Sequence, residues 1–256
     1  MRTVERNDPS SVISRVAAIL SAFKLADENI GVSELSRRTD LPKTTVHRLC
    51  RDLVAHRMLE RDGNSLRLGL RLFELGEQAS HRRNLSDVAL PIMADLRGAT
   101  RQTVHLAVLD GTEVVYIQIL REKSAPRLPS RVGGRLPAHA TAIGKAMLAF
   151  SSPDVVDAVI GGGLARLGPR TTVAPVLLRR DLARIRASGI AQEHEESGAG
   201  IVCAASPVLD DDGSPRAAVS ISGWVGQLNP SRMAPAVKTA ALSIARALHQ
   251  GAYAPA

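Results

Sequence analysis

Residues 32–53 read VSELSRRTDLPKTTVHRLCRDL, and this stretch decides the fold of the N-terminal part of the chain. A helix is expected to begin near Ser33, a good N-cap, and to end at Asp40, which tolerates the left-handed conformation. Pro42 fits the first turn of the next helix. That helix has one apolar face, formed by Val46, Leu49, Cys50 and Leu53. The stretch therefore predicts two helices joined by a tight turn.

Further elements flank these two helices on both sides. Residues 12–23 place apolar side chains on one face of a preceding helix. Residues 58–61 and 65–68 are short runs around the turn pair Asp62-Gly63, which is typical of a β-hairpin. Three helices followed by a basic hairpin are the order of a winged helix-turn-helix. We expect this domain over residues 1–68.

A helix-turn-helix reads double-stranded DNA with the outward residues near the start of its second helix. Arg48 is the predicted guanine contact because a guanidinium pairs with both O6 and N7. Arg61 and Arg67 flank the hairpin turn and are expected to add affinity through the DNA backbone or minor groove. The other expected contacts are Ser33, Ser36, Arg37, Lys43, Thr44, Thr45, His47 and Arg51. The alternative is that four arginines only solvate amphipathic helices: Arg37, Arg38, Arg48 and Arg51.

Composition narrows the choice of function. The formal net charge of +8 favours a polyanionic partner. Aromatic residues make up only 2% of the chain, which disfavours stacking on single-stranded RNA.

The N-terminus lacks an apolar signal segment, and no apolar run reaches the ~18 residues of a membrane span. Cys50 and Cys203 lie far apart in apolar surroundings, as in proteins of a reducing compartment. We expect a cytoplasmic protein without disulfide or membrane contact.

The remaining two thirds of the chain mix helix and strand patterns without an internal repeat. Residues 69–82 are predicted to form a linker helix, and residues 83–256 a second domain. Hairpins are expected at 103–120 and 201–221, each around an Asp/Gly-containing turn. The other expected elements are a Pro/Gly/Arg-rich loop at 121–138 and helices at 139–150, after Ser152-Pro153, at 176–188 and at 231–249. This pattern predicts an α+β fold with antiparallel strand pairs.

Several motifs carry a resemblance to a known family. Residues 32–49, together with LRLG at 66–69, resemble the IclR family of bacterial transcriptional regulators. The likeness continues through RLPAHATAIGKA at 135–146, EESGAGIVCAASPV at 195–208 and AVSISG at 218–223. The resemblance implies a GAF-like C-terminal domain with a small-molecule pocket. It also implies homodimers or homotetramers that present paired DNA-binding domains.

The resemblance also implies which residues line the pocket. Ser220 and Ser222 share one face of their strand, and N–H groups at the start of the helix in the 140s could receive a carboxylate. A small organic acid is therefore the expected effector. The full set of implied positions is Leu136, Ala142, Ile143, Glu193, Ile201, Cys203, Ser220 and Ser222. The alternative assigns all of these residues to core packing and backbone hydrogen bonds.

This chain departs from the family pattern at two of its positions. The family often carries Asp where Glu193 stands, and an acidic residue where His194 stands. Both departures bear on the size of the pocket and on its response to pH.

An enzyme is the first rival function. Cys203 with His105, His139 and His194 offers a nucleophile and a base, or a metal set, but the spacings CxxC, HExxH and HxxEH are missing. Residues 139–146 lack the first glycine and the hydroxyl of a P-loop, and residues 220–223 do not form GxSxG. We therefore expect no catalysis, cofactor or metal. An architectural DNA- or RNA-binding protein, the second rival, has no need of a domain with pocket motifs.

The sequence thus predicts a ligand-responsive transcriptional regulator that binds double-stranded operator DNA. We expect a repressor of a catabolic operon that responds to a small organic acid. An activator of the same class is the alternative.

Overall fold

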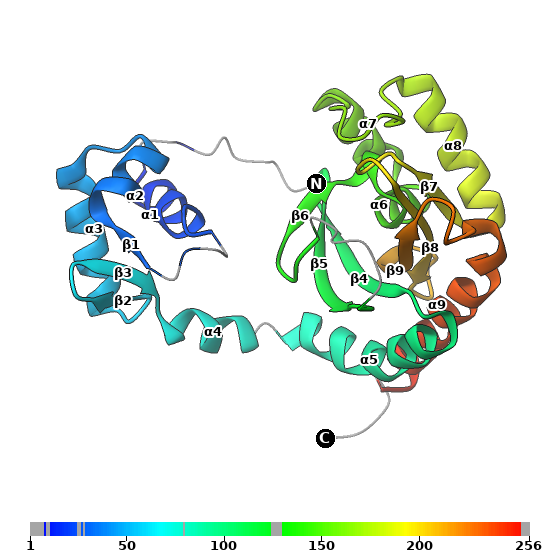
Figure 1. Cartoon of the computed structure of the whole chain (residues 1–256), viewed down its shortest axis with the longest axis horizontal. Helices are drawn as coiled ribbons and strands as arrows, with labels where there is room; N and C mark the ends of the chain where they lie inside the picture. The colour runs from blue at the N-terminus through cyan, green and yellow to red at the C-terminus, as the bar shows by residue number, and fades with distance from the viewer. Residues whose placement is uncertain are drawn as a thin grey trace. The chain divides into compact units, whose positions relative to one another are not determined.

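The structure is a computed structural model that describes residues 8, 11–24, 27, 29–78, 80–123 and 130–251, without the side chains of 80–84 and 251. The chain divides into two compact units, Met1–Ser80 and His81–Ala256 (Figure 1). Separate hydrophobic clusters stabilise the two units. Each unit therefore has its own core.

The first unit has the elements of a winged helix-turn-helix. Its strands pair antiparallel in the order β1-β3-β2, so that β2 and β3 form the predicted hairpin. The apolar face predicted for the second helix of the motif is buried, and Asp40 ends the first with a left-handed φ of 55°. The elements are α1 (Val12–Ser21), β1 (Ile30–Gly31), α2 (Val32–Thr39), α3 (Lys43–Ala55), β2 (Leu59–Asp62), β3 (Ser65–Leu68) and α4 (Leu70–Glu77).

Two predicted helix starts in this unit are wrong by one or two residues. Gly31, not Ser33, is the N-cap of α2, because β1 pairs with β3 up to Gly31 and the chain enters the helix directly from the strand. Pro42 is the N-cap of α3 and lies outside the first turn. Ser33 consequently lies within α2, with an exposed side chain.

The second unit is built around one antiparallel sheet. Its strand order is β6-β5-β4-β9-β8-β7. The elements are α5 (Ser80–Thr100), β4 (Thr103–Asp110), β5 (Glu113–Leu120), β6 (Arg135–Pro137), a 3₁₀ helix (Ala138–Ala140), α6 (Ala142–Leu148), α7 (Pro153–Gly161), α8 (Pro175–Ser188), β7 (Ala191–His194), β8 (Ile201–Leu209), β9 (Pro215–Trp224) and α9 (Pro230–Gly251). The predicted α+β fold class is confirmed.

Helices cover both faces of this sheet and make a three-layer unit (Figure 1). One face packs against α5 and α9 through apolar side chains such as Met93 and Ile244. The other face packs against α6, α7 and α8 through residues such as Met147, Val159 and Leu178. Side chains along each strand alternate between the two layers. Among the residues that the structure describes, no helix has the length and hydrophobicity that a bilayer crossing requires.

Several elements of the second unit differ from the prediction or were not predicted. The loop expected at 121–138 contains strand β6 at its end, and its residues 124–129 lie outside the described residues. The helix expected from 139 begins at Ala142, after a 3₁₀ turn and the N-cap Thr141. Strand β7 and helix α5 were not predicted. In the region expected to be a linker, α4 ends at Glu77 and α5 begins at Ser80.

Gly144 provides a test of how α6 is packed. A Cβ on Gly144 would lie 2.2 Å from the carbonyl oxygen of Ala138, so the backbone of the 3₁₀ helix would have to move. We expect Gly144→Ala to lower the free energy of unfolding by about 1–3 kcal/mol, measured by urea denaturation. Gly161→Ala is the control, because its Cβ would meet nothing within 4 Å. Equal stability of the two variants would contradict close packing at Gly144.

Candidate functional site

The outer face of α3 is the first candidate site. Lys43, Thr44, His47, Arg48 and Arg51 are exposed, and Thr45 is half-buried. Among the described residues no side chain caps the start of this helix, so its first N–H groups and its positive end favour a phosphate. The arrangement presents basic and hydroxyl side chains on a helix whose opposite face is fixed in the core.

The residues predicted on α2 have different roles in the structure. The Ser36 hydroxyl donates a hydrogen bond to the Leu41 carbonyl at 2.6 Å, so it holds the turn between α2 and α3. Arg37 donates to both oxygens of Glu34, at 2.7 and 2.5 Å. Ser33 is exposed on the same helix. Ser36 therefore positions the motif, whereas Arg37 must leave Glu34 to contact DNA.

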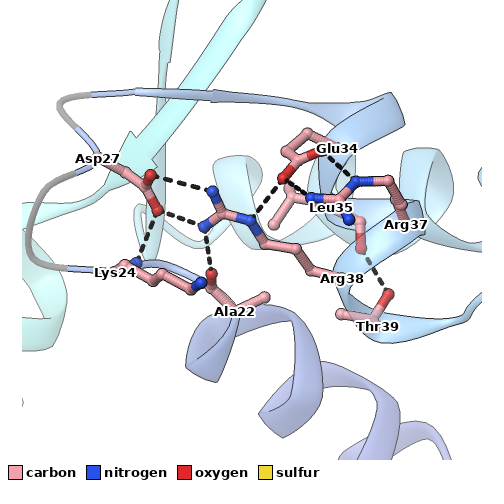
Figure 2. Close-up of polar contacts among 8 residues, drawn as sticks. All are labelled: Ala22, Lys24, Asp27, Glu34, Leu35, Arg37, Arg38 and Thr39. Carbon is pink, nitrogen blue, oxygen red and sulfur yellow. Dashed lines mark hydrogen bonds and ion pairs between the residues drawn. The ribbon is translucent and has the colours of Figure 1, made fainter.

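Arg38 fastens α2 to the end of α1. Its guanidinium lies between the carboxylates of Asp27 and Glu34, as Figure 2 shows, with N···O distances of 2.5 and 2.8 Å. It also donates to the Ala22 carbonyl at 2.9 Å. The Arg38 side chain is only 18% exposed. The sequence offered Arg38 as a solvating surface residue, whereas in the structure it holds α2 against the end of α1.

The same contacts lower the pKa of both carboxylates. Hydrogen bonds from Arg37 and Arg38 lower the pKa of Glu34 to about 2. The hydrogen bond from Arg38 is the largest cause that lowers the pKa of Asp27 to about 2. Both groups therefore stay ionised throughout the physiological pH range.

The hairpin of β2 and β3 carries the two remaining predicted contacts. Arg61 and Arg67 are both exposed. Arg67 faces Glu60 across the strands, with an N···O distance of 2.9 Å. Glu60 also accepts a hydrogen bond from the backbone N–H of Leu70 at 3.2 Å. Glu60 thus orients Arg67 and connects the hairpin to the start of α4.

The second candidate site, which we call the effector cavity, lies between the sheet and α6. All eight positions implied by the family motifs line it: Leu136, Ala142, Ile143, Glu193, Ile201, Cys203, Ser220 and Ser222. Five residues that were not predicted complete the lining: His105, Tyr116, Ser130, Thr141 and Ser197. The free volume is about 20 Å³, which is room for about one water molecule.

Strand register explains why these residues meet. Glu193, Cys203 and Ser222 are direct neighbours across β7, β8 and β9. His105 on β4 lies opposite Ser220 on β9. Directly paired residues point to the same face of a sheet. The alternation within the predicted hairpin at 103–120 was the signal for His105, but its pairing with β9 cannot be read from local sequence.

Glu193 is the buried charge of the effector cavity, with 1% of its surface exposed. One carboxylate oxygen accepts the backbone N–H of Ala142 at 3.1 Å. The other accepts the backbone N–H of Ser197 at 2.8 Å and also its hydroxyl. The expectation that the start of α6 is open to a ligand carboxylate is therefore corrected, because the chain's own carboxylate occupies it.

A chain of polar contacts crosses the floor of the cavity. His105 bonds to Ser130 through Nε2 at 3.0 Å and approaches Ser222 with Nδ1 at 3.5 Å. The Ser222 hydroxyl contacts the Cys203 thiol at 3.0 Å. Burial lowers the pKa of His105 to about 3, so the imidazole is neutral at pH 7. These groups offer a ligand neutral donors and acceptors.

The geometry does not support the rival catalytic interpretation. Burial, reinforced by Glu193, raises the pKa of the Cys203 thiol well above its usual value, whereas a nucleophile needs the thiolate. His139 bonds to the Ala165 carbonyl at 3.0 Å, and His194 is exposed on the edge strand. Across the described part of the chain, no group of three or more His, Cys, Asp or Glu side chains is placed to hold a metal.

Comparison with known families gives matches to both parts of the chain. The family model described as "IclR helix-turn-helix domain" matches residues 12–63. The model described as "Bacterial transcriptional regulator IclR C-terminal" matches residues 77–248. The first range includes the α3 surface, and the second includes the whole lining of the effector cavity.

Relatives of known name and known structure agree with these matches. The HTH-type transcriptional repressor AllR of Klebsiella pneumoniae is 35% identical over 226 residues, which cover 87% of this chain and 83% of that protein. An IclR homolog from Microbacterium hydrocarbonoxydans, solved with 4-hydroxybenzoate, is 32% identical with a TM-score of 0.87 and covers 94% of this chain and 100% of its own. The Thermotoga maritima IclR structure is 28% identical, with a TM-score of 0.74, over 92% and 98% of the two chains.

Asp27 provides a pH test of the Arg38 contact. Because its folded pKa is about 2, below the usual 3.8, the stabilisation is full above about pH 5 and is lost as the pH falls from about 4 towards 2. We expect wild type to be more stable than Asp27→Asn at pH 6, with a gap that narrows at pH 3. Urea unfolding followed by amide NMR signals of α2 measures this gap.

As a control, the same comparison is made in the Arg38→Gln background. There we expect the gap to depend less on pH, because Lys24 still lowers the pKa of Asp27 after Arg38 is removed. A gap of constant size between pH 3 and pH 6 in the wild-type background would contradict the assigned contact.

Proposed function

Since the chain belongs to the IclR family of bacterial transcriptional regulators, we propose that it is a repressor whose affinity for operator DNA is set by a small organic acid in the effector cavity. Family membership makes the chain a ligand-responsive DNA-binding regulator and agrees with a GAF-like second domain. The observation that carries the proposal is the convergence of all eight motif-derived positions on one cavity.

Two relatives support the finer parts of the proposal. The Klebsiella pneumoniae relative is named as a repressor. The Microbacterium hydrocarbonoxydans structure contains 4-hydroxybenzoate, an organic acid. By analogy, the genes controlled by this chain would encode the catabolism of such an acid, and the protein would act in the cytoplasm, where the operator DNA lies.

The cavity must change shape to take up an acid. Its free volume of about 20 Å³ is far below the ~300 Å³ of a typical ligand site. An incoming carboxylate would meet the hydroxyls of Ser220 and Ser222 and would compete with Glu193 for the N–H of Ala142. Displacement of Glu193 would release Ser197 as well. Ligand binding is thereby coupled to the position of the loop after β7. The contacts of Glu193 would differ between the free and the bound state, and such a difference is what allostery requires.

A homodimer would present two reading surfaces to a pseudo-palindromic operator. Large apolar side chains on two elements of the first unit support this assembly. Phe73 on α4 is 64% exposed and Ile13 on α1 is 78% exposed, and Leu70 and Val12 are exposed beside them. A second copy of the chain would bury these side chains. A homotetramer would be a pair of such dimers.

The first test concerns the reading surface. Arg48→Ala should weaken operator binding by about 1–3 kcal/mol and relax the preference at one base pair. Arg67→Ala should weaken binding to all sequences alike. It should also lower the slope of log K against log salt concentration by about one, because one phosphate contact is lost. Fluorescence anisotropy with operator and scrambled DNA at several salt concentrations measures both. An equal loss on both DNAs for Arg48→Ala would remove its base-reading role.

The second test concerns the effector cavity. Ser222→Ala should weaken the binding of a responsive acid about five- to tenfold through the loss of one hydrogen bond, and Ser222→Phe should abolish the response. Operator affinity without ligand should stay unchanged. Isothermal titration with a panel of organic acids that includes 4-hydroxybenzoate measures binding, and Ser214→Phe at an exposed turn is the control. A panel without any member that shifts operator affinity of the wild type would refute the proposal.

A further inference from the structure

A second and larger hollow of the C-terminal unit lies beside α8. We call it the Glu196 groove, because Glu196 forms its floor together with Lys145 of α6. Its walls are one side of α8 and the edge strand β7, which contributes Gln192 and His194. The groove encloses about 920 Å³, within the range of small-molecule sites. None of its lining residues belongs to the effector cavity.

The floor of the groove is a buried charge cluster with one unused acceptor. The Lys145 side chain is 1% exposed, and its ammonium donates to Glu196 Oε1 at 2.6 Å and to Asp181 at 3.0 Å. Burial would lower the pKa of Lys145, but Glu196 and Asp181 outweigh it and raise that pKa, so the ammonium stays charged. The second oxygen of Glu196 is buried without a hydrogen-bond partner among the described residues. A buried acceptor of this kind calls for a donor.

The rim of the groove carries the opposite charge. Arg180 and Arg184 lie one turn apart on α8, and both are exposed. Arg184 pairs with Asp181 at 2.8 Å. Arg180 makes no ion pair within the described part of the chain. The groove therefore has a carboxylate oxygen as an acceptor at its floor and two guanidinium groups at its rim. A guanidinium binds carboxylates well.

We propose that the Glu196 groove binds a small amphoteric molecule, with N–H donors at one end and a carboxylate at the other, as in an amino acid. The N–H end meets the free oxygen of Glu196 once the Glu196 side chain turns this oxygen into the groove. The carboxylate of the ligand meets Arg180 and Arg184. A simple anion would face Glu196 and Asp181 at the floor, and a simple cation would face the arginines at the rim. Only a ligand that carries both groups satisfies both ends.

The position of the groove gives this ligand a route to the effector cavity. Glu196 is followed by Ser197, which holds Glu193 inside that cavity. Helix α6 carries Lys145 on the groove side and Ala142 on the cavity side. Occupancy of either site thus acts on the same helix and loop. This regulatory consequence rests on the proposed function, whereas binding in the groove does not.

The experiment uses the full-length chain and the twenty standard L-amino acids as probes in saturation-transfer NMR. We expect at least one to bind with a Kd below about 1 mM. Its decarboxylated amine and its deaminated acid should each bind about tenfold more weakly, because each lacks one charge-assisted contact. A Kd above about 1 mM for every amino acid, or equal binding of the amino acid and its two analogues, would overturn the proposal.

Variants locate the binding site. The double variant Arg180→Gln/Arg184→Gln should weaken the amino acid about tenfold. Arg179→Gln is the matched control, because Arg179 on the same helix pairs with Asp157 outside the groove. Ser214→Phe, at an exposed turn outside both sites, should leave this binding intact. Binding that survives the double variant, or that is lost in Arg179→Gln, would place the ligand elsewhere and refute the groove.

Discussion

The second unit depends on one buried carboxylate. Glu193 lies on an edge strand, yet 1% of its surface is exposed, and such a charge is tolerated only when hydrogen bonds replace its hydration. Two of those bonds come from backbone N–H groups, of Ala142 at the start of α6 and of Ser197 after β7. One side chain thus fixes a helix and a loop against the sheet. The same carboxylate lines the effector cavity.

In the first unit one charged side chain also joins separate elements, but here the central group is a cation. Arg38 is a largely covered cation held by two carboxylates and a carbonyl, and it fixes α2 on the end of α1. The surface arginines then fall into two kinds. Arg48 has no carboxylate partner among the described residues, so in the proposed complex its guanidinium would not have to leave one to contact DNA. Arg37 and Arg67 already pair with Glu34 and Glu60, so their net gain on DNA is smaller.

Local patterns predicted the parts of this fold that local physics decides. The apolar stripe of α3 and the left-handed Asp40 follow from spacing and side-chain chemistry. The alternation of β8 and β9 brought Cys203 and Ser222 to one face. Strand β7 was missed because Glu193 stands at an inward position, where a polar residue hides the alternation. The pairing of His105 with Ser220, over a hundred residues apart in sequence, depends on the packing of the whole sheet.

A signal from the effector cavity has to cross the sheet. The cavity lies on the face covered by α6, whereas α5, which continues the chain from the first unit, packs on the opposite face. The strands that line the cavity carry side chains on both faces of the sheet. Ile201 and Cys203 of β8 face the α6 side, and Val202 and Ala204, which alternate with them, pack with α5 and α9. Because the sheet is one residue thick, a strand that shifts to admit a ligand also shifts its side chains in the α5 layer. Strand β8 therefore joins the lining of the effector cavity to the layer that contains α5 and α9.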